Sequence, residues 1–271
     1  MSVGAITGVN ATLAVDAYLL TNVPSVPVNT PLRHAEPNKC NLFSLGISPI
    51  NAVIVEKSLI EYPLLDKRKE LISGLKFGFK LQYSGTRLPI RSKNSKSISE
   101  HSELVLRKIN KEVQAGRIAG PFIESPFPTL RVSPIFLAPK KNGDFRLIHN
   151  LSHLSENSLN DFIDPEFCSV RYADIDDAVE MIKRIGKGDM LAKADIKSAF
   201  RLLKVAPSDF DHLGFRFEGK YYFDKCLPMG ASISCSIFET FSTALHWFTE
   251  LQCHSKNILH YLEDFFIRRT R

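Results

Sequence analysis

Residues 190–201 read Met-Leu-Ala-Lys-Ala-Asp-Ile-Lys-Ser-Ala-Phe-Arg, and the predicted fold is built around them. The first half of this stretch is a short apolar run that predicts a buried strand, with Asp195 at its end. Phe200 follows five residues later, between cations at Lys197 and Arg201. A strand that delivers a carboxylate to a basic, aromatic surface favours a metal site that handles phosphates. Taken alone, Asp195 is also compatible with a surface ion pair, and Phe200 with plain core.

The partner that such a site needs lies near the end of the chain, in Tyr261-Leu262-Glu263-Asp264. Apolar residues flank the two acids on both sides, which predicts a hairpin whose turn carries Glu263 and Asp264. Mg²⁺ prefers oxygen ligands, and paired carboxylates can hold two such ions about 4 Å apart. We therefore expect Asp195, Glu263 and Asp264 to be catalytic carboxylates that bind two Mg²⁺ ions, with Mn²⁺ as an alternative.

The composition limits the class of protein. The chain has 271 residues, is 44% hydrophobic and carries a net charge of +6, so it can bury a sizeable core and favours an anionic partner. Its five cysteines are scattered and form no Cys-x-x-Cys pair, which predicts reduced thiols in a cytoplasmic or nuclear protein that is not secreted. No apolar run reaches the ~18 residues of a membrane span, so no membrane partner is expected.

Three regions are expected along the chain. Residues 1–47 are rich in Ser, Thr, Asn and Pro, and predict a poorly ordered leader. Residues 48–118 predict a helical region, and residues 119–271 carry most of the strands and the candidate site. Segment 84–98 is polar and basic, which predicts a linker or a loop that touches nucleic acid. Helices in the second region are expected at about 49–60, 65–79 and 99–115, with Val53 and Ile60 in the buried stripe of the first.

Two hairpins and two further helices complete the predicted organisation. Asn142-Gly143 is a strong hairpin signal between strands expected at 132–139 and 145–151. A second hairpin is expected over 212–225. A helix that Asp174 caps should bury Val179 and Ile182. The long last helix, over about 232–251, should follow the tight bend at 226–230.

The first hairpin presents three cations. Lys140 and Lys141 lie at its tip, and Arg146 lies just inside the second strand. Cations on a projecting hairpin could clamp a triphosphate or contact a template. The alternative is an ordinary solvated hairpin with lysines at its tip, and the sequence alone leaves both interpretations open.

The order of these features resembles that of reverse transcriptases: a basic hairpin, an aspartate strand with an aromatic residue five positions on, a Leu-Pro-x-Gly bend before a helix, then Tyr-x-x-Asp. The closer resemblance is to the polymerase of DIRS-type retrotransposons. It implies an α+β fold, with the fingers and a partial palm of a right-hand polymerase behind a helical leader, the palm being an antiparallel sheet with packing helices. The segments that carry the resemblance are 139–152, 160–164, 192–202 and 222–234.

The resemblance also implies an activity. RNA-directed DNA polymerisation would join a primer 3′-hydroxyl to the α-phosphate of a deoxynucleoside triphosphate on an RNA or DNA template, with pyrophosphate leaving. Lys140 or Lys141, together with Arg146, would hold the triphosphate. Phe200 would pack under the sugar and exclude a 2′-hydroxyl. Nucleotide contacts are further implied for Met229 and Gly230, and primer or template contacts for Tyr261 and Pro228.

Two features depart from the pattern of that family. The family's turn is Tyr-x-Asp-Asp, whereas Glu263 takes the first acid position here. Its additional methylene displaces the carboxylate by about 1 Å, which can cost roughly a hundredfold in rate. The chain also stops at Arg271, which predicts truncation before the thumb. We therefore expect impaired polymerisation, and the alternative is a catalytically inactive, nucleic-acid-binding or interaction fragment derived from a retroelement.

Overall fold

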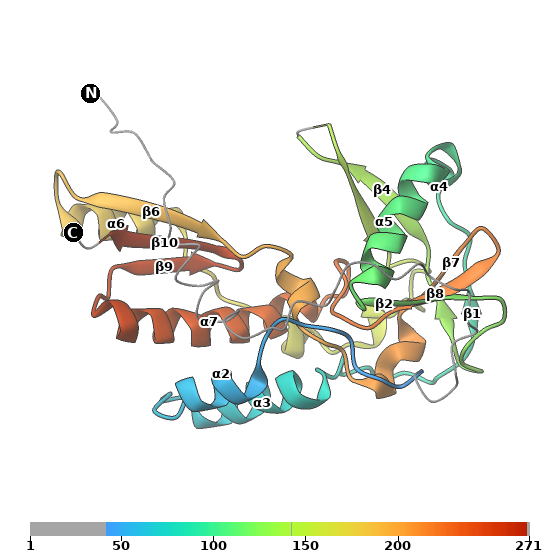
Figure 1. Ribbon diagram of the computed structural model, residues 1–271, viewed down its shortest axis with the longest axis horizontal. Helices are drawn as coiled ribbons and strands as arrows, with labels where there is room; N and C mark the ends of the chain where they lie inside the picture. Colours follow the sequence, from blue (N-terminus) through green and yellow to red (C-terminus); the bar gives the residue numbers. More distant parts are fainter. Residues whose placement is uncertain (1–41, 142, 270–271) are drawn as a thin grey trace.

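A computed structural model describes residues 42–141 and 143–269. In this part of the chain the protein is a mixed α/β structure with a five-stranded, a three-stranded and a two-stranded sheet. Figure 1 shows an elongated molecule, with the three-stranded sheet in one half and the other two sheets in the other half. The leader expected over 1–47 lies outside the described residues, apart from residues 42–47.

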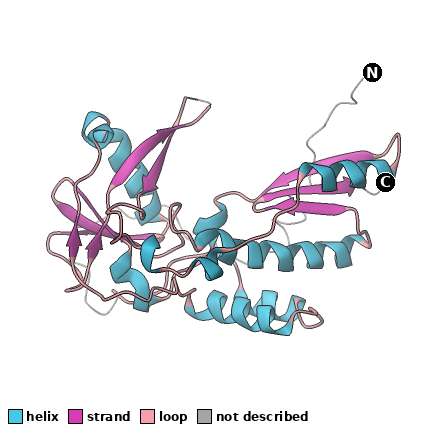
Figure 2. Cartoon of the chain, turned by 180° about the vertical axis from the view of Figure 1, so that it is seen from behind, coloured by secondary structure: helices cyan, strands magenta, loops and turns pink. Residues whose placement is uncertain are grey.

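The three-stranded sheet is antiparallel throughout. Its order is β6 (Met190–Asp195), β10 (Asp264–Arg269) and β9 (Ile258–Tyr261). Helix α7 (Ser234–Cys253) lies below it in Figure 1, and α3 (Leu65–Phe77) and α2 (Ala52–Ser58) lie together below α7. Figure 2 shows α6 (Ile175–Ile185) alongside the sheet. The end of β6 and the β9–β10 turn point towards the other half of the molecule (Figure 1).

The other half combines a sheet with a projecting hairpin. The sheet has the order β1-β3-β7-β8-β2, and the hairpin consists of β4 (Ile135–Pro139) and β5 (Phe145–His149). Helices α4 (Lys96–Glu100) and α5 (Ser102–Gln114) share a hydrophobic cluster with β2, β4 and β7. The sheet strands are β1 (Ile90–Arg91), β2 (Ile118–Phe122), β3 (Arg131–Val132), β7 (Gly214–Phe217) and β8 (Lys220–Asp224).

One large hydrophobic core joins the two halves. Phe210 and Phe223 come from one half and Phe238 and Phe265 from the other, and each is at most 1% exposed. Burial of one such ring contributes about 2–3 kcal/mol. Short 3₁₀ turns connect the core elements, namely η2 (Asn160–Phe162), η3 (Pro165–Cys168), η4 (Ala199–Leu202) and η5 (Pro207–His212).

The structure confirms the predicted hairpins, the strand that ends at Asp195 and the long last helix. Two predicted helix faces are only partly right. In the first, Ile50 and Leu59 are buried, but Val53 and Ile60 are 54% and 71% exposed, and Ile60 lies beyond the end of α2. Val179 and Ile182 are 40% and 44% exposed, whereas Met181 of the same helix is buried. The apolar residues of α6 share one side, but only the edge of that side at Met181 is buried, so periodicity identified the apolar side and not the part of it that packs.

Segment 84–98 is not a plain linker. It contains β1 and part of α4. Arg87 in this segment donates hydrogen bonds to the buried carboxylates of Asp209 and Asp211, at 3.0 and 2.6 Å. A single cation thus fastens the segment to the 3₁₀ turn η5. The polar and basic composition reflects this ion pairing as well as exposure to solvent.

Candidate active site

Three predicted residues form a row across the end of the three-stranded sheet. Asp264 is paired with Asp195 of β6 on one side and with Tyr261 of β9 on the other. Residues that lie directly opposite each other in antiparallel strands project from the same face. Asp195 is exposed and Tyr261 is 52% exposed, so the row faces solvent. The fold thereby brings together two carboxylates that are 69 positions apart in the chain.

The turn that joins β9 to β10 is strained and tightly held. It consists of Leu262 and Glu263, while Asp264 is already the first residue of β10. Leu262 has a φ of 51°, a conformation that costs a residue with a side chain about 1–2 kcal/mol. The carbonyl of Glu263 accepts a hydrogen bond of 2.9 Å from the backbone N–H of Ile196, directly after β6. This bond fixes the turn to the end of the strand that carries Asp195.

Lys193 neutralises part of the charge in this row. Its Nζ lies 3.0 Å from Oδ1 of Asp264. Two carboxylates that face each other across a strand pair repel, and a nearby cation relieves that repulsion. Sequence reasoning did not select Lys193 as a site residue. The available signal was its position two residues before Asp195, which places both side chains on one face of β6.

The number of carboxylates in the row matches what Mg²⁺ commonly binds in proteins. Mg²⁺ in proteins is commonly held by one or two carboxylates, with water and substrate phosphates as the other ligands. Asp195 and Asp264 provide two carboxylates on one exposed face. Across residues 42–141 and 143–269, however, no group of three or more His, Cys, Asp or Glu residues is arranged to hold a metal ion. The three-carboxylate site with Glu263 therefore remains a prediction.

Phe200 and Arg201 have different surroundings, although both were expected at a basic, aromatic surface. The Phe200 ring is half-buried, 5.3 Å between centroids from the ring of Phe238 in α7. The Arg201 side chain is only 15% exposed and donates to Asp224 Oδ1 at 2.6 Å. For Arg201 the expectation of a basic surface is therefore wrong. Both residues lie in the 3₁₀ turn η4, and the long-range contacts of Arg201 with Asp224 and Glu112 left no local signal in the sequence.

Arg201 belongs to a buried network of charges. Its Nε also donates to Glu112 at 3.2 Å. Burial alone would lower the pKa of Arg201, but the charges of Asp224 and Glu112 outweigh it and raise that pKa above its ordinary value. Burial would likewise raise the pKa of Asp224, and the charge of Arg201 reverses this shift and lowers it. The network thus keeps both groups ionised inside the protein.

The same network reaches the base of the projecting hairpin. Asp224 Oδ2 lies 3.0 Å from Nδ1 of His149, the last residue of β5. The other ring nitrogen of His149 lies 3.1 Å from the carbonyl oxygen of Gly214. Both ring nitrogens of His149 therefore lie within hydrogen-bond distance of an oxygen atom. The turn that carries Phe200 and the strand that carries Arg146 are therefore anchored to one another.

The predicted bend also lies against the hairpin base. Gly230 has a φ of +119°, and a Cβ on it would lie 2.2 Å from the carbonyl oxygen of His149. Asn160 donates from Nδ2 to the carbonyl of Gly230 at 2.8 Å and accepts at Oδ1 from the N–H of Ser232 at 2.9 Å. Pro228 is buried, whereas Met229 is 40% exposed. Gly230 thus lies against the end of β5.

The hairpin cations differ in their availability. Lys140 and Lys108 both contact Asp144, at 3.2 and 3.0 Å, and hydrogen bonding to Lys108 is the first cause of a lowered pKa for Asp144. Lys141 and Arg146 are exposed. Among the described residues, no hydrogen bond or ion pair joins the hairpin cations to Asp195, Glu263 or Asp264.

One aromatic neighbour of the row was not predicted. The Tyr172 ring lies 4.7 Å between centroids from the ring of Tyr261. Burial, followed by its contact with Cys235, raises the pKa of Tyr172 to about 12, so its hydroxyl stays protonated at neutral pH. Tyr172 and Tyr261 are 89 positions apart in the sequence, and no local pattern indicates that they meet.

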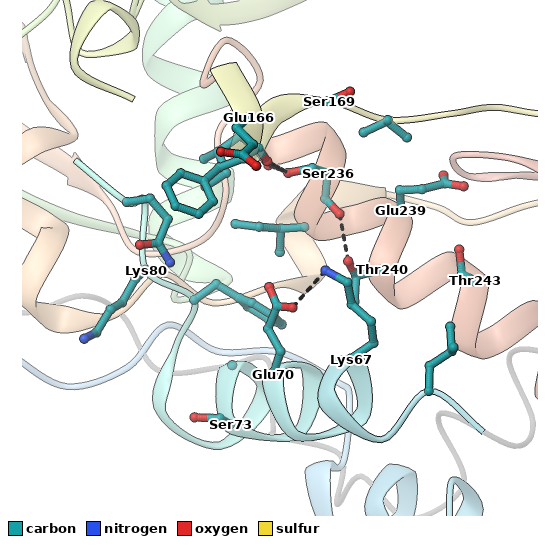
Figure 3. Close-up of a pocket in the computed structure, with 18 of the residues that line it drawn as sticks. Lys67, Glu70, Ser73, Lys80, Glu166, Ser169, Ser236, Glu239, Thr240 and Thr243 are labelled. Atoms are coloured by element: carbon teal, nitrogen blue, oxygen red, sulfur yellow. Dashed lines mark hydrogen bonds and ion pairs between the residues drawn. The ribbon is translucent and has the colours of Figure 1, made fainter. Parts of the chain in front are cut away.

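A cavity of 620 Å³ lies away from the row, between α3, η3 and α7 (Figure 3). Figure 3 shows Lys67 and Glu70 of α3 paired on one side, opposite the hydroxyls of Ser236 and Thr240 on α7. None of the residues that line this cavity is a predicted site residue. Its lining charges are of both signs, so the cavity shows no preference for an anionic ligand.

No family model matches the chain. It is 26% identical over 197 residues to the Transposon Tf2-7 polyprotein of Schizosaccharomyces pombe and 23% identical over 202 residues to the Tf2-3 polyprotein of the same organism. These matches cover 72% and 74% of this chain, which spans only 13% and 14% of the relatives.

A solved structure has a fold similar to that of this chain. The selenomethionine-labelled CSH mutant of Prototype Foamy Virus Protease-Reverse Transcriptase superposes with a TM-score of 0.52 at 14% identity, over 84% of this chain and 30% of that chain. In the described ranges, no helix is long and apolar enough to cross a membrane. The chain thus resembles a region of retrotransposon polyproteins and shares the fold of part of a retroviral protease-reverse transcriptase.

Proposed function

We propose that the chain is the fingers and partial palm of an RNA-directed DNA polymerase from a DIRS-type retrotransposon. Residues 48–118 form the helical region before the polymerase, and residues 119–271 form the fingers and the part of the palm that is present. The three-stranded sheet is the palm, and the β4–β5 hairpin belongs to the fingers. The partners are a primer–template of RNA or DNA and deoxynucleoside triphosphates.

The observation that carries the proposal is the row of Asp195, Asp264 and Tyr261 at one end of the palm sheet. That end points towards the half of the molecule that bears the basic hairpin (Figure 1). A two-metal nucleotidyl transfer needs carboxylates beside a site for phosphates. The arrangement places the acids on the exposed face of a rigid sheet, with exposed cations on the hairpin.

Each remaining residue takes a role that its surroundings allow. Mg²⁺ at Asp195 and Asp264 would supply charge neutralisation for the reacting phosphates. Lys141 and Arg146 bind the triphosphate, and Lys140 assists once it leaves Asp144. Phe200 packs against the sugar, and Met229 and Gly230 form the neighbouring wall. Tyr261 meets the primer terminus, with the buried Pro228 shaping the bend from below.

Glu263 is the residue that limits catalytic activity in the proposed polymerase. It occupies the strained turn, and its side chain does not complete a three-residue metal cluster with the described acids. Activity is therefore impaired. The test is Mg²⁺-dependent incorporation of one deoxynucleotide on a primed RNA template by the parent chain, Glu263→Asp and Asp195→Ala. Incorporation by the parent or by Glu263→Asp, with none by Asp195→Ala, supports the proposal; incorporation that survives Asp195→Ala overturns it.

A second candidate function is nucleic-acid binding without catalysis. The absence of a three-carboxylate cluster within the described ranges favours it, as does the exposed Arg146 on the hairpin. Binding that depends on backbone charge weakens steeply with salt. The parent and Glu263→Asp would then both fail to extend a primer, while Lys141→Ala and Arg146→Ala would each lower the salt-dependent affinity for primer–template measured by fluorescence anisotropy.

A further inference from the structure

The ion pair between Lys193 and Asp264 occupies the face on which the metal is expected. Lys193 Nζ lies 3.0 Å from Asp264 Oδ1, and both side chains are partly exposed, at 59% and 43%. Asp264 of β10 is paired in register with Asp195 of β6. Asp195 follows Lys193 by two residues on β6. The three charges therefore share one face at one end of the sheet.

We propose that Lys193 is the built-in counter-cation of the Asp195–Asp264 pair and that it competes with the divalent ion for this pair. This inference rests on the proposed metal site and adds a residue that sets its affinity. Without a metal, the ammonium relieves the repulsion between the facing carboxylates. When the metal is bound, the ammonium of Lys193 repels the ion and no longer stabilises the two facing carboxylates.

The size of the competition follows from the charges. A divalent ion and an ammonium about 5 Å apart in a water-like medium repel each other enough to weaken metal binding roughly tenfold. Lys193 is exposed, so the screened, water-like value is the appropriate one. Removing its charge should therefore strengthen metal binding by about that factor, and keeping the charge should leave the affinity unchanged.

The test is titration of the chain with Mn²⁺, in which electron paramagnetic resonance measures the free ion without nucleic acid or nucleotide. Lys193→Met removes the charge and keeps the length of the side chain, and Lys193→Arg keeps the charge. Lys187→Met removes an exposed lysine beyond the other end of β6 and controls for net charge. Asp195→Asn shows whether the ion binds at the row. Circular dichroism checks that each variant is folded.

We expect Lys193→Met to bind Mn²⁺ about tenfold more tightly than the parent, with Lys193→Arg and Lys187→Met within about twofold of it. Equal or weaker binding by Lys193→Met overturns the inference while leaving the metal site intact. Equal tightening by Lys187→Met also overturns it, because net charge would then explain the effect. Binding that Asp195→Asn does not weaken, or no binding by any variant, overturns the metal site of the proposed function itself.

Discussion

Gly230→Ala tests whether the bend is packed as closely on the hairpin as the structure indicates. A Cβ at Gly230 would lie 2.2 Å from the carbonyl oxygen of His149, and the φ of +119° is unfavourable for alanine. The backbone conformation costs about 1–2 kcal/mol. Forcing the carbonyl away adds about 1–3 kcal/mol, as overpacking in a core does. The free energy of unfolding should therefore fall by about 2–5 kcal/mol.

Gly188→Ala is the matched control. Gly188 has a φ of +95°, and a Cβ there would meet no atom within 4 Å. It therefore carries the conformational cost of about 1–2 kcal/mol without the contact cost. Urea unfolding of both variants, with linear extrapolation to water, gives the two free energies. Equal losses for Gly188→Ala and Gly230→Ala would refute the close approach of the bend to β5.

Three further changes test the network, the bend and a buried histidine. Arg201→Met leaves the buried Asp224 and the half-buried Glu112 without their shared cation. It should cost about 3–5 kcal/mol in urea unfolding, and a loss below about 1 kcal/mol would contradict the network. Asn160→Ala removes hydrogen bonds on both sides of the bend and should cost about 1–3 kcal/mol, measured in the same way. Burial lowers the pKa of His212 from its ordinary 6.5 to about 4. The unfolded chain therefore binds a proton in this range that the folded chain does not, so stability should fall by up to about 3 kcal/mol as the pH drops from 6.5 to 4. His212→Gln should remove this pH dependence, and an unchanged slope would contradict it.

Much of the local structure was accessible from the sequence, because it depends on neighbouring residues. Asn142-Gly143 predicted the β4–β5 hairpin, although Asn142 itself lies outside the described residues. The alternating and apolar runs predicted β6 and the β9–β10 hairpin. The side chain of Asp174 accepts from the backbone N–H groups of Asp176 and Asp177, as its predicted capping role requires.

The features that escaped prediction depend on distant contacts. Arg201 is 89 residues away from Glu112 in the chain but donates a hydrogen bond to it. The expected surface cation is therefore buried. Tyr172 meets Tyr261 only because η3 and α6 return to the sheet. The close approach of Gly230 to His149 requires both the bend and the hairpin to be in place. Periodicity carries no information about such pairs.

Iron-directed cleavage would locate the divalent ion that we propose where β6 ends and β10 begins. Fe²⁺ can replace Mg²⁺ in a chain treated with ascorbate and peroxide, and the radicals formed cut the backbone nearest to the ion. We expect fragments that end near Asp195 and near Asp264, and we expect Asp195→Asn to lose them. Hydrogen bonds also join His260 of β9 to His246 and Glu239 of α7. Cleavage near these three residues instead would contradict the proposed site.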